Sequence, residues 1–139
     1  MSRFINLTFS YEDEEKDMCV KVESIASYVV DPDDATKTKI TFSNSQMNTE
    51  NFIANLTVIE LESLIAAATE ATQEFVIINT GNPFDPPFTN TKISVENMDG
   101  FAFCAIDGLT EYNILFVRNS RVIFCTSESI ATIKTKIYT

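Results

Sequence analysis

The chain has 139 residues, 20 of them acidic and 10 basic, and a formal net charge of −10 at pH 7. It contains no histidine, which excludes Ser-His and Cys-His nucleophile pairs and an ordinary histidine-containing zinc site. Such an acidic chain is a poor general binder of DNA or RNA, because contacts to phosphate need Lys and Arg. An apolar share of 45% still indicates a globular protein with a core.

The first part of the chain has the alternating pattern of β-strands. Apolar and polar residues alternate at 4–9 and again at 18–30, where small residues near 24–27 predict a bend. A charged loop at 11–17 separates the two predicted strands. The segment 31–34 is a predicted turn, because its proline fixes φ and its aspartates can bond their own backbone.

Two more strands and a helix complete the first half. The strands are predicted at 36–42 and 52–56, after which the apolar period changes from two to about 3.6 residues. Thr57 and Glu60 have the spacing of a capping box for a helix that ends near Thr72. The predicted core-facing stripe of this helix is Leu61, Leu64, Ile65 and Ala68.

The second half begins with a compact apolar strand at 75–79. Three prolines at 80–91 predict a loop without regular ladder pairing. A long strand follows at 92–106, interrupted near 99–100, and Asp-Gly at 107–108 predicts a turn.

The tail predicts a hairpin and a last helix. The hairpin pairs 111–117 with 121–125 across the polar turn 118–120, and Thr126 is the predicted cap of the helix. The residues of this helix expected to face the core are Ile130, Ile133 and Ile137.

The two halves repeat the same series of residue types. The segment 20–25, VKVESI, matches 93–98, ISVENM, and the segment 40–42 matches 114–116. We therefore predict an α+β fold of two related antiparallel units, 1–72 and 73–139. Each unit is expected to have the order β-β-β-β-α, with one short helix. A half of this size is marginal for a core of its own, so we expect the units to share one compact body.

The hairpin and the start of the last helix resemble the short flagellar and swarming FlbD-type proteins, and small phage proteins of the same shape. The resemblance is carried by ILFVRNSRVIF at 114–124 and TSESI at 126–130, and more weakly by the first half. The turn has Asn119-Ser120 where that family tends to have Asn-Gly. The resemblance implies no enzyme activity and leaves the partner open.

The proline loop is the candidate partner-binding segment. Two phenylalanines stand there among turn-forming residues, and exposed aromatic side chains on a stiff loop lose little entropy on binding. The alternative is that both rings fold back and cover the end of the sheet. With two arginines of the tail hairpin, the predicted partner-binding residues are Asn82, Phe84, Asp85, Phe88, Arg118 and Arg121.

The sequence predicts no catalytic residue, no cofactor and no metal site. Asp31, Asp33 and Asp34 offer oxygen ligands, but the segment lacks the glycine and the terminal glutamate of an EF-hand loop. The function we expect is a non-catalytic interaction or structural component of a phage or bacterial assembly, which forms a homo-oligomer or binds a protein.

Two alternatives stay open. One is a sponge for a nucleotide signal, in which Phe84 or Phe88 stacks a base and Arg118 or Arg121 meets a phosphate. The other is an acidic nucleic acid mimic. The three cysteines form no CxxC pair and predict buried, reduced thiols. No signal peptide or membrane span is visible, so the expected location is the bacterial cytoplasm or the virion.

Overall fold

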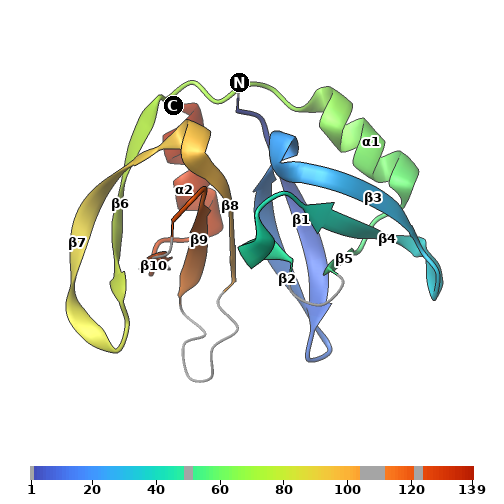
Figure 1. Ribbon diagram of the computed structural model, residues 1–139, viewed down its shortest axis with the longest axis horizontal. Helices are drawn as coiled ribbons and strands as arrows, with labels where there is room; N and C mark the ends of the chain where they lie inside the picture. Colours follow the sequence, from blue (N-terminus) through green and yellow to red (C-terminus); the bar gives the residue numbers. More distant parts are fainter. Residues whose placement is uncertain (1, 49–51, 104–111, 121–123) are drawn as a thin grey trace.

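The computed structural model describes residues 2–48, 52–103, 112–120 and 124–139. Within them the chain is mostly strand, with two α-helices and three short 3-10 turns, which confirms a mixed α+β fold rich in β-structure (Figure 1). The elements of the first half are β1 (Phe4–Tyr11), β2 (Glu14–Lys21), η1 (Val22–Ser24), β3 (Ile25–Asp31), β4 (Asp34–Phe42), η2 (Ser45–Met47), β5 (Phe52–Ala54) and α1 (Val58–Ala67). Those of the second half are β6 (Phe75–Asn82), β7 (Asp85–Ser94), η3 (Val95–Asn97), β8 (Met98–Phe103), β9 (Asn113–Val117), β10 (Phe124–Thr126) and α2 (Ile130–Tyr138).

The strands form two antiparallel sheets that meet edge to edge. A seven-stranded sheet has the order β1-β2-β8-β9-β10-β6-β7, and a three-stranded sheet has the order β3-β4-β5. The backbone N–H of Asn55, directly after β5, donates to the carbonyl of Thr8 in β1 at 2.8 Å. The ten strands therefore follow one another in a single series that begins at β3 and ends at β7.

Each half of the chain contributes five consecutive strands to this series. The first half supplies β3-β4-β5-β1-β2 and the second half supplies β8-β9-β10-β6-β7, so the strands have the same relative order in both. The halves are joined where β2 pairs with β8. Five strands per half replace the four that we expected, because the segments predicted as single long strands are each divided by a 3-10 turn.

The predicted strand at 18–30 is the first example. Instead of a bend, the 3-10 turn η1 divides this segment into two strands. β2 belongs to the seven-stranded sheet and β3 to the three-stranded sheet. The predicted charged loop at 11–17 is also shorter than expected, because only Glu12 and Asp13 form the turn between β1 and β2. Both residues have positive φ, at 50° and 63°, as a tight two-residue hairpin requires.

The proline segment was predicted incorrectly as a loop. Residues 85–94 form β7, which pairs with β6 from Phe75↔Ser94 to Asn82↔Asp85. The prolines are accommodated because β7 is the last strand of its sheet and its register shifts near them, since an edge strand needs donors on one side only. The Pro86-Pro87 peptide bond is cis.

Helix capping was predicted correctly for α1 but not for α2. Thr57 accepts from the backbone N–H of Glu60 and the Glu60 carboxylate accepts from that of Thr57, which confirms the capping box. The helix ends at Ala67 rather than near Thr72. The cap of α2 is Ser129, which accepts from the N–H of Thr132, because Thr126 is buried at the end of β10.

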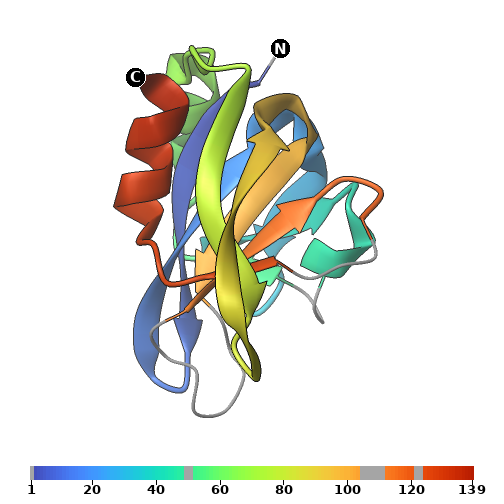
Figure 2. The same ribbon diagram turned by 90° about the vertical axis from the view of Figure 1, so that its left-hand side faces the viewer.

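The core has two clusters of buried side chains, and both draw on both halves. One cluster, mostly from the second half, includes Phe4 and Cys19, while the other, mostly from the first half, includes Ala102. Side chains of β2 alternate between them, because successive residues of a strand point to opposite faces. α2 lies against one side of the seven-stranded sheet (Figure 2), where Ile133 and Ile137 are buried as predicted.

Candidate functional site: sheet edges, an exposed hairpin and a polar pocket

The β6–β7 hairpin separates the two predicted phenylalanine anchors. Phe84 lies in its turn, is 71% exposed, and is held by a hydrogen bond from its N–H to the side chain of Asn82 at 2.9 Å. Asp85 follows it and pairs in register with Asn82. Phe84 is therefore presented to solvent on a tight turn, as a contact residue would be.

Phe88 has the opposite orientation. Its ring is half-buried and packs on that of Tyr112, with 5.7 Å between ring centroids. It also lies so close to Gly81 that a Cβ atom at that position would come within 2.9 Å of the ring. Phe88 therefore closes the hairpin and belongs to the fold.

Arg118 lines a polar pocket elsewhere in the structure. Its guanidinium meets the Asp99 carboxylate at 3.1 Å, and the side-chain amide of Asn44 donates to the other Asp99 oxygen at 3.1 Å. The pocket has a volume of about 480 Å³. Its lining residues are Glu23, Ser43, Asn44, Ser45, Gln46, Asp99, Val117, Arg118, Asn119 and Ser120. Arg121 lies outside the described residues.

Asp99, which lines this pocket, belongs to a buried ion pair with Lys21. Lys21 and Asp99 are 1% and 2% exposed, and Lys21 Nζ lies 3.9 Å from an Asp99 oxygen while donating to the carbonyl of Glu96. Burial lowers the pKa of Lys21 from its ordinary value of 10.5, and the nearby Asp99 carboxylate opposes this change. Sequence analysis missed both residues. The alternating pattern places Lys21 on the solvent-facing side of a strand, and its partner Asp99 is remote in sequence.

Among the described residues, Arg118 does not line a common pocket with Phe84 or Phe88, as a nucleotide site built from these side chains would need. No aromatic side chain is among the described lining residues of the Arg118 pocket, and Phe84 and Phe88 belong to the β6–β7 hairpin. Arg118 is also already engaged by the Asp99 carboxylate, which it shares with Lys21, and Glu23, which pairs with Arg3, adds a second carboxylate to the lining.

Both ends of the strand series are open edges. Within the part of the chain that the structure describes, β3 pairs only with β4 and β7 only with β6. On β3, Tyr28, Val29 and Val30 are 37%, 58% and 47% exposed. An exposed apolar edge is a template for another strand, so β3 is the stronger candidate contact surface of the two.

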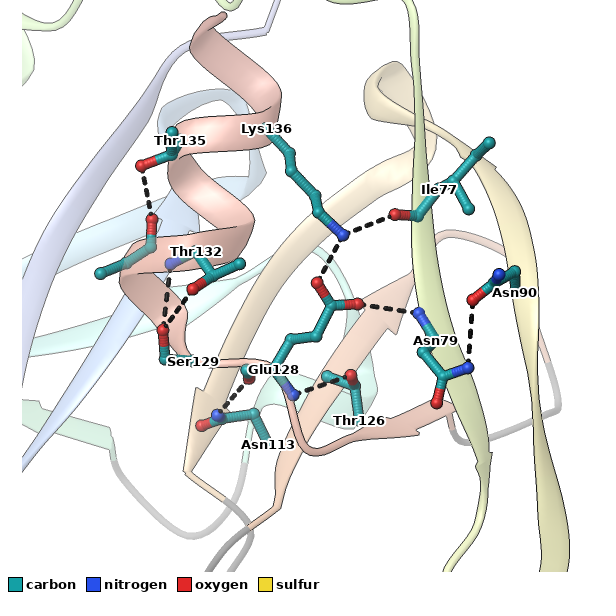
Figure 3. Close-up of polar contacts among 11 residues, drawn as sticks. Ile77, Asn79, Asn90, Asn113, Thr126, Glu128, Ser129, Thr132, Thr135 and Lys136 are labelled. Atoms are coloured by element: carbon teal, nitrogen blue, oxygen red, sulfur yellow. Dashed lines mark hydrogen bonds and ion pairs between the residues drawn. The ribbon is translucent and has the colours of Figure 1, made fainter.

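A second polar cluster fastens α2 to the edge hairpin (Figure 3). The Glu128 carboxylate accepts from the N–H of Asn79 in β6 at 2.8 Å and pairs with Lys136 of α2. Lys136 also donates to the carbonyl of Ile77 at 2.9 Å, and the Glu128 carbonyl accepts from Asn113 at 2.9 Å. The partners are backbone groups, an opposite charge and the side-chain amide of Asn113, all from the fold itself, which assigns the cluster a structural role.

The predicted acidic turn is also accounted for by local bonds. Asp31 accepts from the N–H of Asp33 at 3.2 Å and Asp34 from that of Thr36 at 2.9 Å, which confirms the predicted turn chemistry. No cluster of three metal-ligating side chains occurs among the described residues. In the same residues, no helix is long and apolar enough to cross a membrane.

Comparisons with protein-family models, with curated proteins and with solved structures found no match to this chain.

Proposed function

We propose that this chain is a non-catalytic interaction module, a building or accessory component of a phage or bacterial assembly, made of two related units. The observation that carries the proposal is the open β3 edge, where three consecutive apolar side chains are exposed. Strand addition to such an edge gives affinity through backbone hydrogen bonds and specificity through side chains.

The β6–β7 hairpin supports the same function from the other end of the strand series. Besides Phe84, it exposes Phe75 at 46% and Ile77 at 55%. Hydrophobic anchors on a rigid element lose little entropy on binding. Figure 1 shows the hairpin and β3 on opposite sides of the molecule, so the chain has two separate contact surfaces.

The repeated order of strands supports the two related units. In the second half, β10 meets β6 at Cys125↔Gly81, and in the first half the residue after β5 bonds to Thr8 of β1. Gly81 and Thr8 are separated by the same 73 residues that relate the matched segments beginning at Val20 and Ile93. The partners on the other side, Asn55 and Cys125, are 70 residues apart, so the two contacts are at similar places in the two halves.

The test measures self-association and partner capture with matched baits. Wild-type protein is examined by light scattering over a wide concentration range, and as a bait in pull-downs from bacterial extracts. A Val29→Lys, Phe84→Ser bait has changes on both proposed surfaces, and an Ile59→Ser bait has one at the 76% exposed Ile59 of α1. We expect association that the double variant loses and the control keeps. A strict monomer with no partner specific to the wild-type bait contradicts the proposal.

A further inference from the structure

We propose that copies of this chain join head to tail, with β7 of one copy pairing antiparallel with β3 of the next. The inference rests on the proposed function and identifies the partner of the open edges as a second copy. Its basis is that the molecule already contains one contact of this kind between its own halves.

The internal contact is the pairing of β2 with β8. In the strand series, β2 is the last strand of the first half and β8 is the first strand of the second half. The corresponding strands are β7, the last of the second half, and β3, the first of the first half. Within the described ranges of the chain, neither has a partner strand on its outer side. Joining β7 to β3 of another copy therefore repeats the internal contact and continues the series.

The internal register predicts the register between copies. Inside the chain the pairs are Met18↔Ala102, Cys19↔Phe101 and Val20↔Gly100. The matched segments are related by a shift of 73 residues. Adding 73 to the β2 residues gives their counterparts in β7, and subtracting 73 from the β8 residues gives their counterparts in β3. The pairs expected between copies are therefore Thr91↔Val29, Lys92↔Tyr28 and Ile93↔Ser27.

The exposure of apolar side chains at the open edges is what an interface with another copy would remove. Met18 and Ala102 are 3% and 6% exposed inside the chain, whereas Val29, the counterpart of Ala102, is 58% exposed. Covering such apolar surface favours association at roughly 25 cal/mol per Å² buried.

In this register, Lys92 of β7 has an opposite charge near it, at Glu62 of α1 beside β3. Lys92 is exposed on β7 and would face Tyr28, whose hydroxyl donates to the Glu62 carboxylate of α1 at 3.2 Å. The contact would bring the ammonium of one copy to an aromatic ring and a carboxylate of the next, both of which attract a cation.

The geometry requires a second copy, because one copy cannot close the series on itself. β7 and β3 lie on opposite sides of the molecule in Figure 1. A contact between two different surfaces leaves one edge of each kind open in every complex that is not a closed ring. Such contacts form rings when the rotation closes and filaments when it does not.

Two edge-blocking variants test the proposal by complementation. Val29→Asp places a carboxylate where the β3 edge would be buried but leaves β7 intact. Lys92→Glu reverses the charge on β7, toward Glu62 of the neighbour, but leaves β3 intact. Wild type should associate with increasing concentration at about 150 mM salt, where repulsion between the acidic copies is screened. Each variant alone should associate roughly a hundredfold more weakly, and their equimolar mixture should stop at dimers.

A disulfide measures the register directly. In a Cys104→Ser background, an oxidised mixture of Thr91→Cys and Val29→Cys should give a covalent dimer. The matched control, Thr91→Cys with Ser27→Cys, uses an exposed residue of the same face of β3, two residues out of register, and should give little dimer. Ile59→Asp on α1 should leave association unchanged.

The outcomes separate this inference from the proposed function. Oligomers that survive both edge variants, or that form both disulfides equally, overturn the β7–β3 contact but leave self-association standing. Wild type that stays monomeric at every concentration, together with no disulfide between the Thr91→Cys and Val29→Cys chains, also overturns it. In that case the pull-down with the Val29→Lys, Phe84→Ser bait alone decides the proposed function.

Discussion

At the scale of single residues, the buried pair of Lys21 and Asp99 should be sensitive to substitution. Both side chains are almost completely buried, and Asp99 also holds Arg118 and Asn44. Removing one charge of a buried pair costs about 3–5 kcal/mol, because the other charge is left uncompensated. We expect Lys21→Met and Asp99→Asn to destabilise the fold separately, with a favourable coupling of about 1–3 kcal/mol between them. Urea unfolding of the two single variants and the double variant measures this, and additive losses contradict it.

The same pair predicts a dependence of stability on pH. Burial places the pKa of Lys21 in the folded state below the value of 10.5 that it has when unfolded. Between these two values the unfolded state binds more protons, so the free energy of unfolding rises with pH. Asp99→Asn removes the carboxylate that opposes the lowering of the Lys21 pKa. The pH range over which the free energy of unfolding rises therefore extends to lower pH in this variant. Between pH 7 and 10 the Asp99→Asn variant should therefore gain more stability than wild type. The double variant, which has Lys21→Met as well as Asp99→Asn, should not. Equal slopes for wild type and Asp99→Asn would contradict the assignment.

At the scale of elements, Glu128 determines how α2 is attached to β6. Among the described residues, β10 and β6 pair only at Cys125↔Gly81, and the Glu128 carboxylate accepts a hydrogen bond from the nearby N–H of Asn79 (Figure 3). Glu128→Ala leaves that donor and Lys136 without this acceptor and should cost about 1.5–3 kcal/mol. Glu128→Gln keeps an acceptor oxygen of the same reach and should cost about 1 kcal/mol or less. Thermal unfolding of both variants checks this, and equal losses would mean that the ion pair with Lys136 dominates.

Elements that depend on neighbours in sequence were predicted well. The Thr57–Glu60 capping box and the aspartate turn after β3 each need only residues two or three positions apart, so the sequence contains the whole interaction. The strand β7 was missed because its prolines are tolerated only at a sheet edge, and edge position depends on the whole strand order. Thr126 was predicted wrongly as the cap of α2 for a related reason, because its burial at the end of β10 depends on distant packing.

The candidate site was predictable only in part, and for the same physical reason. The sequence drew attention to the segment of Phe84 and Phe88, yet the opposite exposure of the two rings depends on Tyr112, which lies in another part of the chain. Nothing in the alternating pattern of β3 indicated that Val29 would lie on an open edge. Lys21 and Asp99 could not be paired from sequence, because buried charges that meet across β2 and β8 follow no local pattern.

At the scale of the whole molecule, the structure predicts that neither half folds alone. Fragment 1–72 lacks β8, the partner of β2, and fragment 73–139 lacks Phe4 and Cys19 from its main buried cluster. Chains of about 70 residues have little stability to lose. At low micromolar concentration each fragment should therefore give the narrow amide spectrum of an unfolded chain. An equimolar mixture should recover the dispersed spectrum of the intact protein, because β2 and β8 can pair again. Full-length protein should unfold in urea in a single transition, and a stably folded monomeric fragment 1–72 would contradict the shared core.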